Sequence, residues 1–106
     1  MSDDMPEAVR PPVTGRVLGM VYNERMRQEG MKAEGRFDFT CADDGLTNAE
    51  KLTVLTEEVG EVAREVLTQD GRRLARDTLG TREALLNEVT QVAAVAVAWM
   101  EALLYD

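Results

Sequence analysis

Two stretches decide the fold: residues 47–67 read TNAEKLTVLTEEVGEVAREVL, and residues 85–104 read LLNEVTQVAAVAVAWMEALL. Thr47 and Glu50 form a capping box, in which each side chain accepts a hydrogen bond from the other residue's backbone N–H. Apolar residues follow at spacings of three and four, the period of one helical face; they are Leu52, Leu55, Val59, Val62 and Val66. These features predict a helix from residue 47 to residues 67–69, before Asp70-Gly71.

The second stretch predicts a helix over about residues 82–104 that is apolar nearly all round. At about 100° per residue, Val92, Val95 and Trp99 share one side, and the opposite side carries Leu86, Ala93, Val97 and Met100. A helix of this kind is buried on most of its faces. Three helices of one small chain cannot cover it, so we expect a homodimer or homotetramer whose subunits complete the core.

The remaining residues predict one more helix and two irregular segments. Apolar residues at helical spacing favour a helix over about residues 16–32, with Gly30 and Gly35 fraying its end. Residues 1–14 hold all three prolines and predict a flexible arm. Residues 35–46 are rich in turn residues and predict a loop. The expected fold is therefore all-α, a small helical bundle that occupies residues 15–106 as a single domain.

Composition excludes several kinds of chemistry. The chain has no histidine, one serine (Ser2) and one cysteine (Cys41), so Ser-His-Asp and Cys-His catalysis and histidine-ligated zinc sites have no residues to use. Its 20 acidic and 12 basic residues give a net charge of −8, which argues against a nucleic-acid-binding surface. The lone cysteine fits a reducing cytosol. Because we find no signal-peptide pattern and residues 92–100 are too short to span a bilayer, we expect a cytoplasmic protein without membrane contact.

The acidic residues instead form two groups at helical spacing. Glu57, Glu58 and Glu61 lie on neighbouring positions of one helix, where like charges repel and a divalent cation would relieve the repulsion. Glu88 and Gln91 lie three apart on the other, beside its apolar side. Two antiparallel helices that each present such a pair inward match a carboxylate metal site. Alternatively, the first group is a solvated acidic face, and Glu88 pairs with an arginine such as Arg64 or Arg82.

Three further features have two interpretations each. Gly60 lowers the helix propensity of its segment by about 1 kcal/mol, which suggests close approach by another helix or by a ligand. The basic cluster Arg72, Arg73 and Arg76 is either a solvated loop or a contact for substrate phosphates. Phe37 and Phe39 either pack within their loop or stack on a base.

The segments EKLTVLTEEVGEVAREVL and LLNEVTQVAAVAVAWMEAL resemble the MazG-like nucleoside triphosphate pyrophosphohydrolases. This all-α superfamily also includes dimeric dUTPases and phosphoribosyl-ATP pyrophosphohydrolases. Its signature is EExxE on one helix and ExxD on a later helix, which correspond here to residues 57–61 and to the motif that begins at Glu88. The resemblance covers about residues 47–104.

The resemblance implies Mg²⁺-dependent hydrolysis of a nucleoside or deoxynucleoside triphosphate, which could carry a non-standard base, to the monophosphate and pyrophosphate, with Mn²⁺ as a possible substitute. It also implies metal ligation by Glu58, Glu61 and Glu88, activation of water by Glu57, and dimers or tetramers. The chain departs from the pattern at Gln91, which replaces an aspartate and supplies a neutral oxygen in place of a charged one. The alternative function is therefore a catalytically degenerate oligomer that binds a nucleotide or a protein partner.

Overall fold

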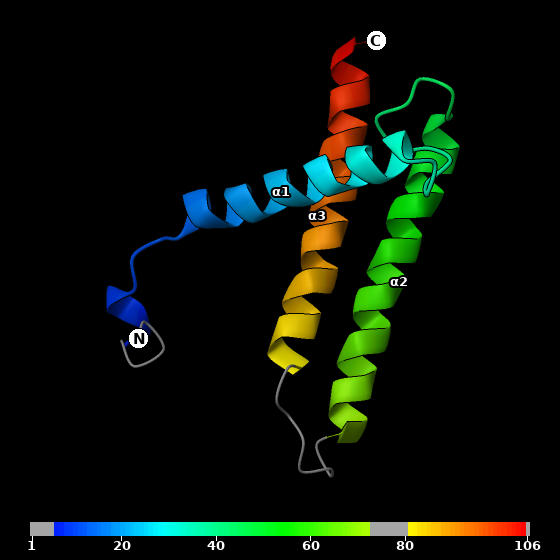
Figure 1. The fold of residues 1–106 in the computed structure, drawn as a ribbon. Coiled ribbons are helices and arrows are strands. Elements are labelled where there is room, and N and C mark those ends of the chain that lie inside the picture. The colour runs from blue at the N-terminus through cyan, green and yellow to red at the C-terminus, as the bar shows by residue number, and fades with distance from the viewer. Residues whose placement is uncertain (1–5, 73–80, 106) are drawn as a thin grey trace.

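The computed structural model describes residues 6–72 and 81–105, apart from the side chains of Glu7, Arg72 and Thr81. A short 3₁₀ turn, η2 (Glu7–Val9), precedes three helices: α1 (Thr14–Ala33), α2 (Asn48–Arg72) and α3 (Thr81–Tyr105). Helices α2 and α3 lie antiparallel and side by side, and α1 crosses α3 (Figure 1). The described residues contain no strand, which confirms the all-α class.

The helix ends show which local signals act. The capping box is present: Thr47 N donates to Glu50 Oε1 at 2.9 Å, and Glu50 N donates to Thr47 Oγ1 at 3.1 Å. Gly35 has a φ of 79°, and the chain turns out of α1 there, as expected of a glycine after a helix end. Gly30, in contrast, lies inside α1. Helix α2 also continues past its predicted end, because glycine lowers helix propensity without by itself stopping a helix.

The core is small and centres on the inward side of α3. It is formed by Val21 from α1, Cys41 from the loop, and four residues of α3: Ala94, Val95, Ala98 and Ala102. Trp99 packs against this cluster and donates its indole N–H to Asn48 Oδ1 at 3.0 Å. The two predicted apolar sides of α3 therefore differ in burial within one chain, because Val95 on one side is buried and Met100 on the other is exposed.

Helix α2 turns its apolar stripe only partly toward the rest of the chain. Leu52 is 53% exposed and Val59 50% exposed, whereas Lys51 is buried and Glu58 is half-buried. The inward side of α2 is therefore rotated away from the stripe. Gly60 is also exposed, and a Cβ atom added there would meet no neighbouring atom within 4 Å. No close approach to Gly60 is thus made within the described part of the chain.

The single chain exposes more surface than a compact protein of its mass. Its accessible surface is 8001 Å², against about 5,900 Å² for a folded monomer of 11.8 kDa. Its radius of gyration is 16.4 Å, against about 13 Å for a compact domain of this length. Large apolar side chains are exposed on all three helices, among them Leu18, Tyr22, Leu52, Val66, Leu86, Met100 and Leu104.

One helix segment meets a length and composition test for crossing a membrane. Residues Arg82–Tyr105 of α3 form a continuous, largely apolar helix of 24 residues, much longer than the apolar run at 92–100. The core helix of a soluble protein passes the same test, and the inward side of α3 is packed against the rest of the chain. This property is therefore weak evidence for a membrane span.

Candidate carboxylate site

The site residues predicted on α2 and α3 line one hollow of about 320 Å³, which we call the carboxylate hollow. Its walls are Val54, Glu57, Glu58, Glu61, Glu88 and Gln91. The antiparallel packing of α2 and α3 brings these two groups together from 27 or more residues apart in sequence (Figure 1). The structure therefore assembles all five predicted residues around one space.

Glu58 is the most unusual side chain of this hollow. Its Oε2 atom is buried and has no hydrogen-bond partner, unlike the other buried polar side-chain atoms that the structure describes. Burial raises the pKa of Glu58, and the nearby carboxylates of Glu88, Glu61, Glu24 and Glu57 raise it further. A buried carboxylate oxygen without a partner is costly, so this position favours a cation or a proton.

Helix α1 contributes a further carboxylate that sequence reasoning missed. Glu24 lies close enough to raise the pKa of Glu58, and its own oxygens accept hydrogen bonds from Arg27 at 2.9 and 2.8 Å. The ion pair with Arg27 offsets part of the negative charge of Glu24. No spacing in the sequence marks Glu24, because its proximity to Glu58 depends on how α1 crosses α3.

The oxygen atoms that line the carboxylate hollow suit a hard divalent cation, although they do not converge on one coordination centre. Carboxylate and amide oxygens are the ligands that Mg²⁺ and Mn²⁺ prefer. In the part of the chain that the structure describes, no three acidic or cysteine side chains converge closely enough to form a preformed metal group. The unpartnered Glu58 oxygen supports the fit, and rotation of flexible glutamate side chains would be needed to complete a coordination shell.

Two basic features of the prediction have different outcomes. Arg64, one expected partner for Glu88, pairs instead with Glu61. The distance from Arg64 Nη1 to Glu61 Oε2 is 3.6 Å. Both side chains of this pair are largely exposed, so the contact contributes little stability. Arg73 and Arg76 lie outside the described residues, as does the side chain of Arg72. Their predicted contact with substrate phosphates remains a prediction.

A second hollow adjoins the first on the side of α1. We call it the aromatic hollow; it has about 330 Å³, and its lining includes Gln28, Phe37, Phe39, Thr40, Cys41 and Val95. Glu58, Val54 and Gln91 line both hollows, so the two spaces meet at Glu58. Arg27 and Arg36 also line the aromatic hollow. Phe37 and Phe39 therefore line a space next to the carboxylates.

Comparison with known proteins adds no relative. No protein-family model, no curated protein and no solved structure matches this chain.

Proposed function

We propose that this chain is a MazG-like nucleotide pyrophosphohydrolase that uses Mg²⁺ to cleave a nucleoside triphosphate to the monophosphate and pyrophosphate. The observation that carries the proposal is the half-buried Glu58 carboxylate, which has an unpartnered oxygen and stands among Glu57, Glu61 and Glu88. Repulsion among these groups is unfavourable unless a divalent cation or protons neutralise it. A polyphosphate chelated to that cation is a ligand that such a hollow accepts.

The proposal assigns different tasks to the acidic residues. Glu58, Glu61 and Glu88 hold the cation with Gln91 as a neutral oxygen donor, and Glu57, which is exposed, stays free to accept a proton. When bound, Mg²⁺ neutralises charge that develops on the phosphate oxygens. Glu57 accepts a proton from water as the water oxygen bonds to phosphorus at the α–β anhydride. The bond from that phosphorus to the bridging oxygen breaks, and pyrophosphate and the monophosphate separate.

The aromatic hollow is positioned to bind the nucleoside part of a substrate whose phosphates lie in the carboxylate hollow. It meets the carboxylate hollow at Glu58, so a ligand with phosphates at the acidic end extends its base toward Phe37 and Phe39. Aromatic rings stack on nucleobases with little regard to sequence or base type. Arg27 and Gln28 supply hydrogen-bond donors and acceptors in the same hollow.

The proposal includes self-association as a homodimer or homotetramer. The chain exposes about 2,000 Å² more than a compact monomer of its mass. Two chains together have a surplus of about 4,000 Å², and obligate homodimers bury about 2,000–5,000 Å² in total over both partners, so the surplus is of the size that one such interface removes. The half-exposed stripe of α2, which includes Leu52, Val59 and Val66, is an apolar surface that a second copy would cover.

A catalytically degenerate protein is the second candidate, and one residue favours it. Gln91 stands at the point where the two hollows meet, where the resembling family has an aspartate. The missing negative charge lowers the expected affinity for Mg²⁺. In this second case the chain binds a nucleotide or a protein partner without turnover.

The test is release of pyrophosphate from a panel of nucleoside and deoxynucleoside triphosphates with Mg²⁺ or Mn²⁺. We expect turnover by the native chain and a loss of at least about 100-fold in Glu58→Gln, the size of effect seen when a group that stabilises transition-state charge is removed. Glu34→Gln is the matched control, because Glu34 is exposed and lines neither hollow. Equal rates for the native chain and Glu58→Gln would refute the enzyme proposal. Activity that appears only in Gln91→Asp would favour the degenerate alternative.

A further inference from the structure

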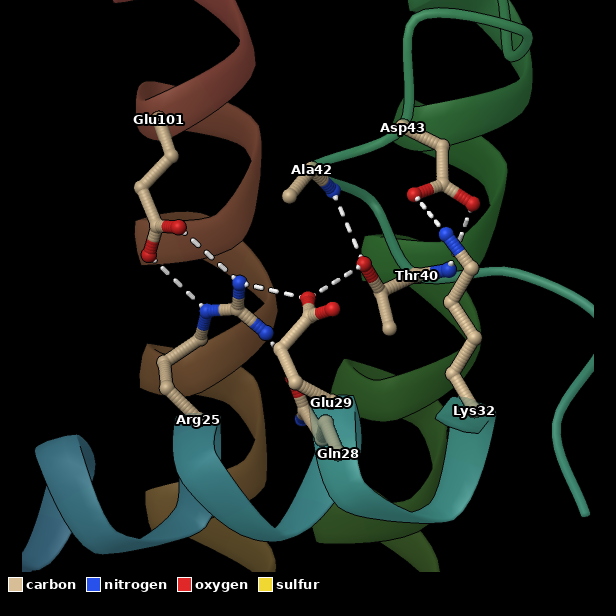
Figure 2. Close-up of polar contacts among 8 residues, drawn as sticks. All are labelled: Arg25, Gln28, Glu29, Lys32, Thr40, Ala42, Asp43 and Glu101. Atoms are coloured by element: carbon tan, nitrogen blue, oxygen red, sulfur yellow. Dashed lines mark hydrogen bonds and ion pairs between the residues drawn. The ribbon is translucent and has the colours of Figure 1, made fainter. Parts of the chain in front are cut away.

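The segment that carries Phe37 and Phe39 has no regular secondary structure, and two side-chain contacts tie it to α1 (Figure 2). Thr40 Oγ1 donates to Glu29 Oε2 at 2.8 Å, and Lys32 Nζ donates to Asp43 Oδ1 at 2.6 Å. Each contact joins residues 11 apart in sequence. Residues 40–43 are therefore attached to α1 at both Thr40 and Asp43.

Thr40 is at the centre of this arrangement. Its hydroxyl donates to Glu29 and also accepts from Ala42 N at 3.3 Å, while its backbone N–H donates to Asp43 Oδ2 at 3.2 Å. Thr40 is 6% exposed, and Cys41, which follows it, is 3% exposed. Loss of the Thr40 hydroxyl would thus remove a part-buried hydrogen bond to Glu29 and loosen the wall of the aromatic hollow that Thr40 and Cys41 help to form.

The acceptor Glu29 is itself held in place by α3 through Arg25. Glu29 Oε2 also accepts from Arg25 Nη2 at 2.8 Å. Arg25 Nε and Nη2 donate to the two oxygens of Glu101 on α3, both at 2.9 Å, and Nη1 donates to Gln28 Oε1 at 3.0 Å. Arg25 is 3% exposed, and a guanidinium fork held on three partners is rigid. Figure 2 shows the resulting series from α3 through α1 to the loop.

We propose that Glu29 and Thr40 are positioning residues that hold residues 37–41 as a fixed wall of the aromatic hollow, against which the planar part of the ligand packs. The identity of that ligand rests on the proposed function. Neither residue lines the carboxylate hollow, so their loss acts on ligand binding and leaves the chemical step nearly unchanged. A wall that is already ordered removes part of the entropic cost of binding.

The first measurement is the rate at which a thiol reagent labels Cys41 in the folded protein. Cys41 is the only cysteine, and it lies buried next to Thr40. Thr40→Val removes the hydroxyl at nearly constant shape, and we expect labelling about tenfold faster, the size of one lost hydrogen bond of about 1–1.5 kcal/mol. Thr40→Ser restores the hydroxyl and the native labelling rate. Thr53→Val is the matched control, since the exposed Thr53 hydroxyl donates to the Ala49 carbonyl within α2.

The second measurement separates binding from chemistry with the best nucleotide of the panel. Thr40→Val should raise KM about tenfold with kcat within about twofold of native, since one hydrogen bond is lost outside the reacting groups. Thr40→Ser should return KM to its native value. If Thr40→Val does not fold, Glu29→Ala serves in its place, because it removes the oxygen that accepts the hydrogen bond from Thr40.

The outcomes distinguish this proposal from the proposed function. Unchanged Cys41 labelling in Thr40→Val overturns the fixed wall, and faster labelling with unchanged KM, or with an equal loss of kcat, overturns its role in positioning. A native chain that hydrolyses no nucleotide refutes the proposed function. In that case the labelling rates alone decide whether Glu29 and Thr40 hold the wall.

Discussion

Glu58 carries an unfavourable charge when no divalent cation is present, since its buried oxygen lacks a partner and four glutamates surround it. Glu58→Gln removes that charge at nearly constant shape. We expect the variant to raise the free energy of unfolding in a chelating buffer by about 1 kcal/mol, which is the sum of several like-charge terms. Urea unfolding with and without EDTA measures this. A stability lower than native in chelating buffer would show that the Glu58 charge has a favourable partner.

Divalent cations should reverse this order of stability. A ligand that binds only the folded state raises stability with concentration, so millimolar Mn²⁺ should raise the melting temperature of the native chain more than that of Glu58→Gln. Glu34→Gln should respond as the native chain does, because Glu34 is exposed and outside the carboxylate hollow. Equal shifts in all three proteins would place the cation elsewhere.

Glu101, unlike Glu58, has a favourable partner for its negative charge, the guanidinium of Arg25. Its hydrogen bonds from Arg25 lower its pKa below the usual value of 4.5. A lowered pKa in the folded state contributes stability above pH 4.5, and that stability is lost as the pH falls through the folded pKa. Because the Glu101 side chain is 41% exposed and solvent screens the ion pair, we expect Glu101→Gln to lower the free energy of unfolding by about 1 kcal/mol at pH 7. The difference in that free energy between the native chain and the variant should narrow below pH 4.5. A difference that stays constant from pH 7 to pH 3 would contradict this.

At the scale of elements, α2 shows how far sequence reasoning reaches. Its capping box and its i, i+3 glutamates were readable because both depend only on local helical geometry. The rotation of its apolar stripe away from the inward side was not readable, because that depends on where α3 and α1 pack. Glu24 and Arg25 were missed for the same reason: their roles come from the crossing of α1 over α3 (Figure 1).

Gly60 gives a direct test of the open side of α2. It is exposed, and a Cβ there meets nothing within 4 Å. Gly60→Ala should therefore raise the free energy of unfolding by about 1 kcal/mol through helix propensity, and Ala63→Gly on the same helix should lower it by a similar amount. Thermal unfolding at matched protein concentration measures both. A loss of stability in Gly60→Ala would mean that another helix or a ligand closely approaches this residue.

At the scale of the whole molecule, the exposed surface predicts association. Sedimentation velocity should find the native chain as a dimer or tetramer at micromolar concentration, because its accessible surface exceeds that of a compact monomer of its mass and includes many large apolar side chains. Leu52→Lys with Val66→Lys should dissociate the assembly or abolish folding, since both side chains belong to the half-exposed stripe. Thr53→Lys, exposed on another side of α2, should leave the assembly intact. A native chain that sediments as a stable monomer would refute the proposed interface.

The central claim is that the carboxylates of α2 and α3 support hydrolysis at the α–β anhydride of a nucleotide. The most direct measurement is ³¹P NMR of the products formed from the preferred nucleoside triphosphate with Mg²⁺, by the native chain and by Glu58→Gln. We expect a monophosphate and pyrophosphate in equal amounts from the native chain, and the background rate from Glu58→Gln. A diphosphate with free phosphate, or equal turnover by both proteins, would contradict the claim.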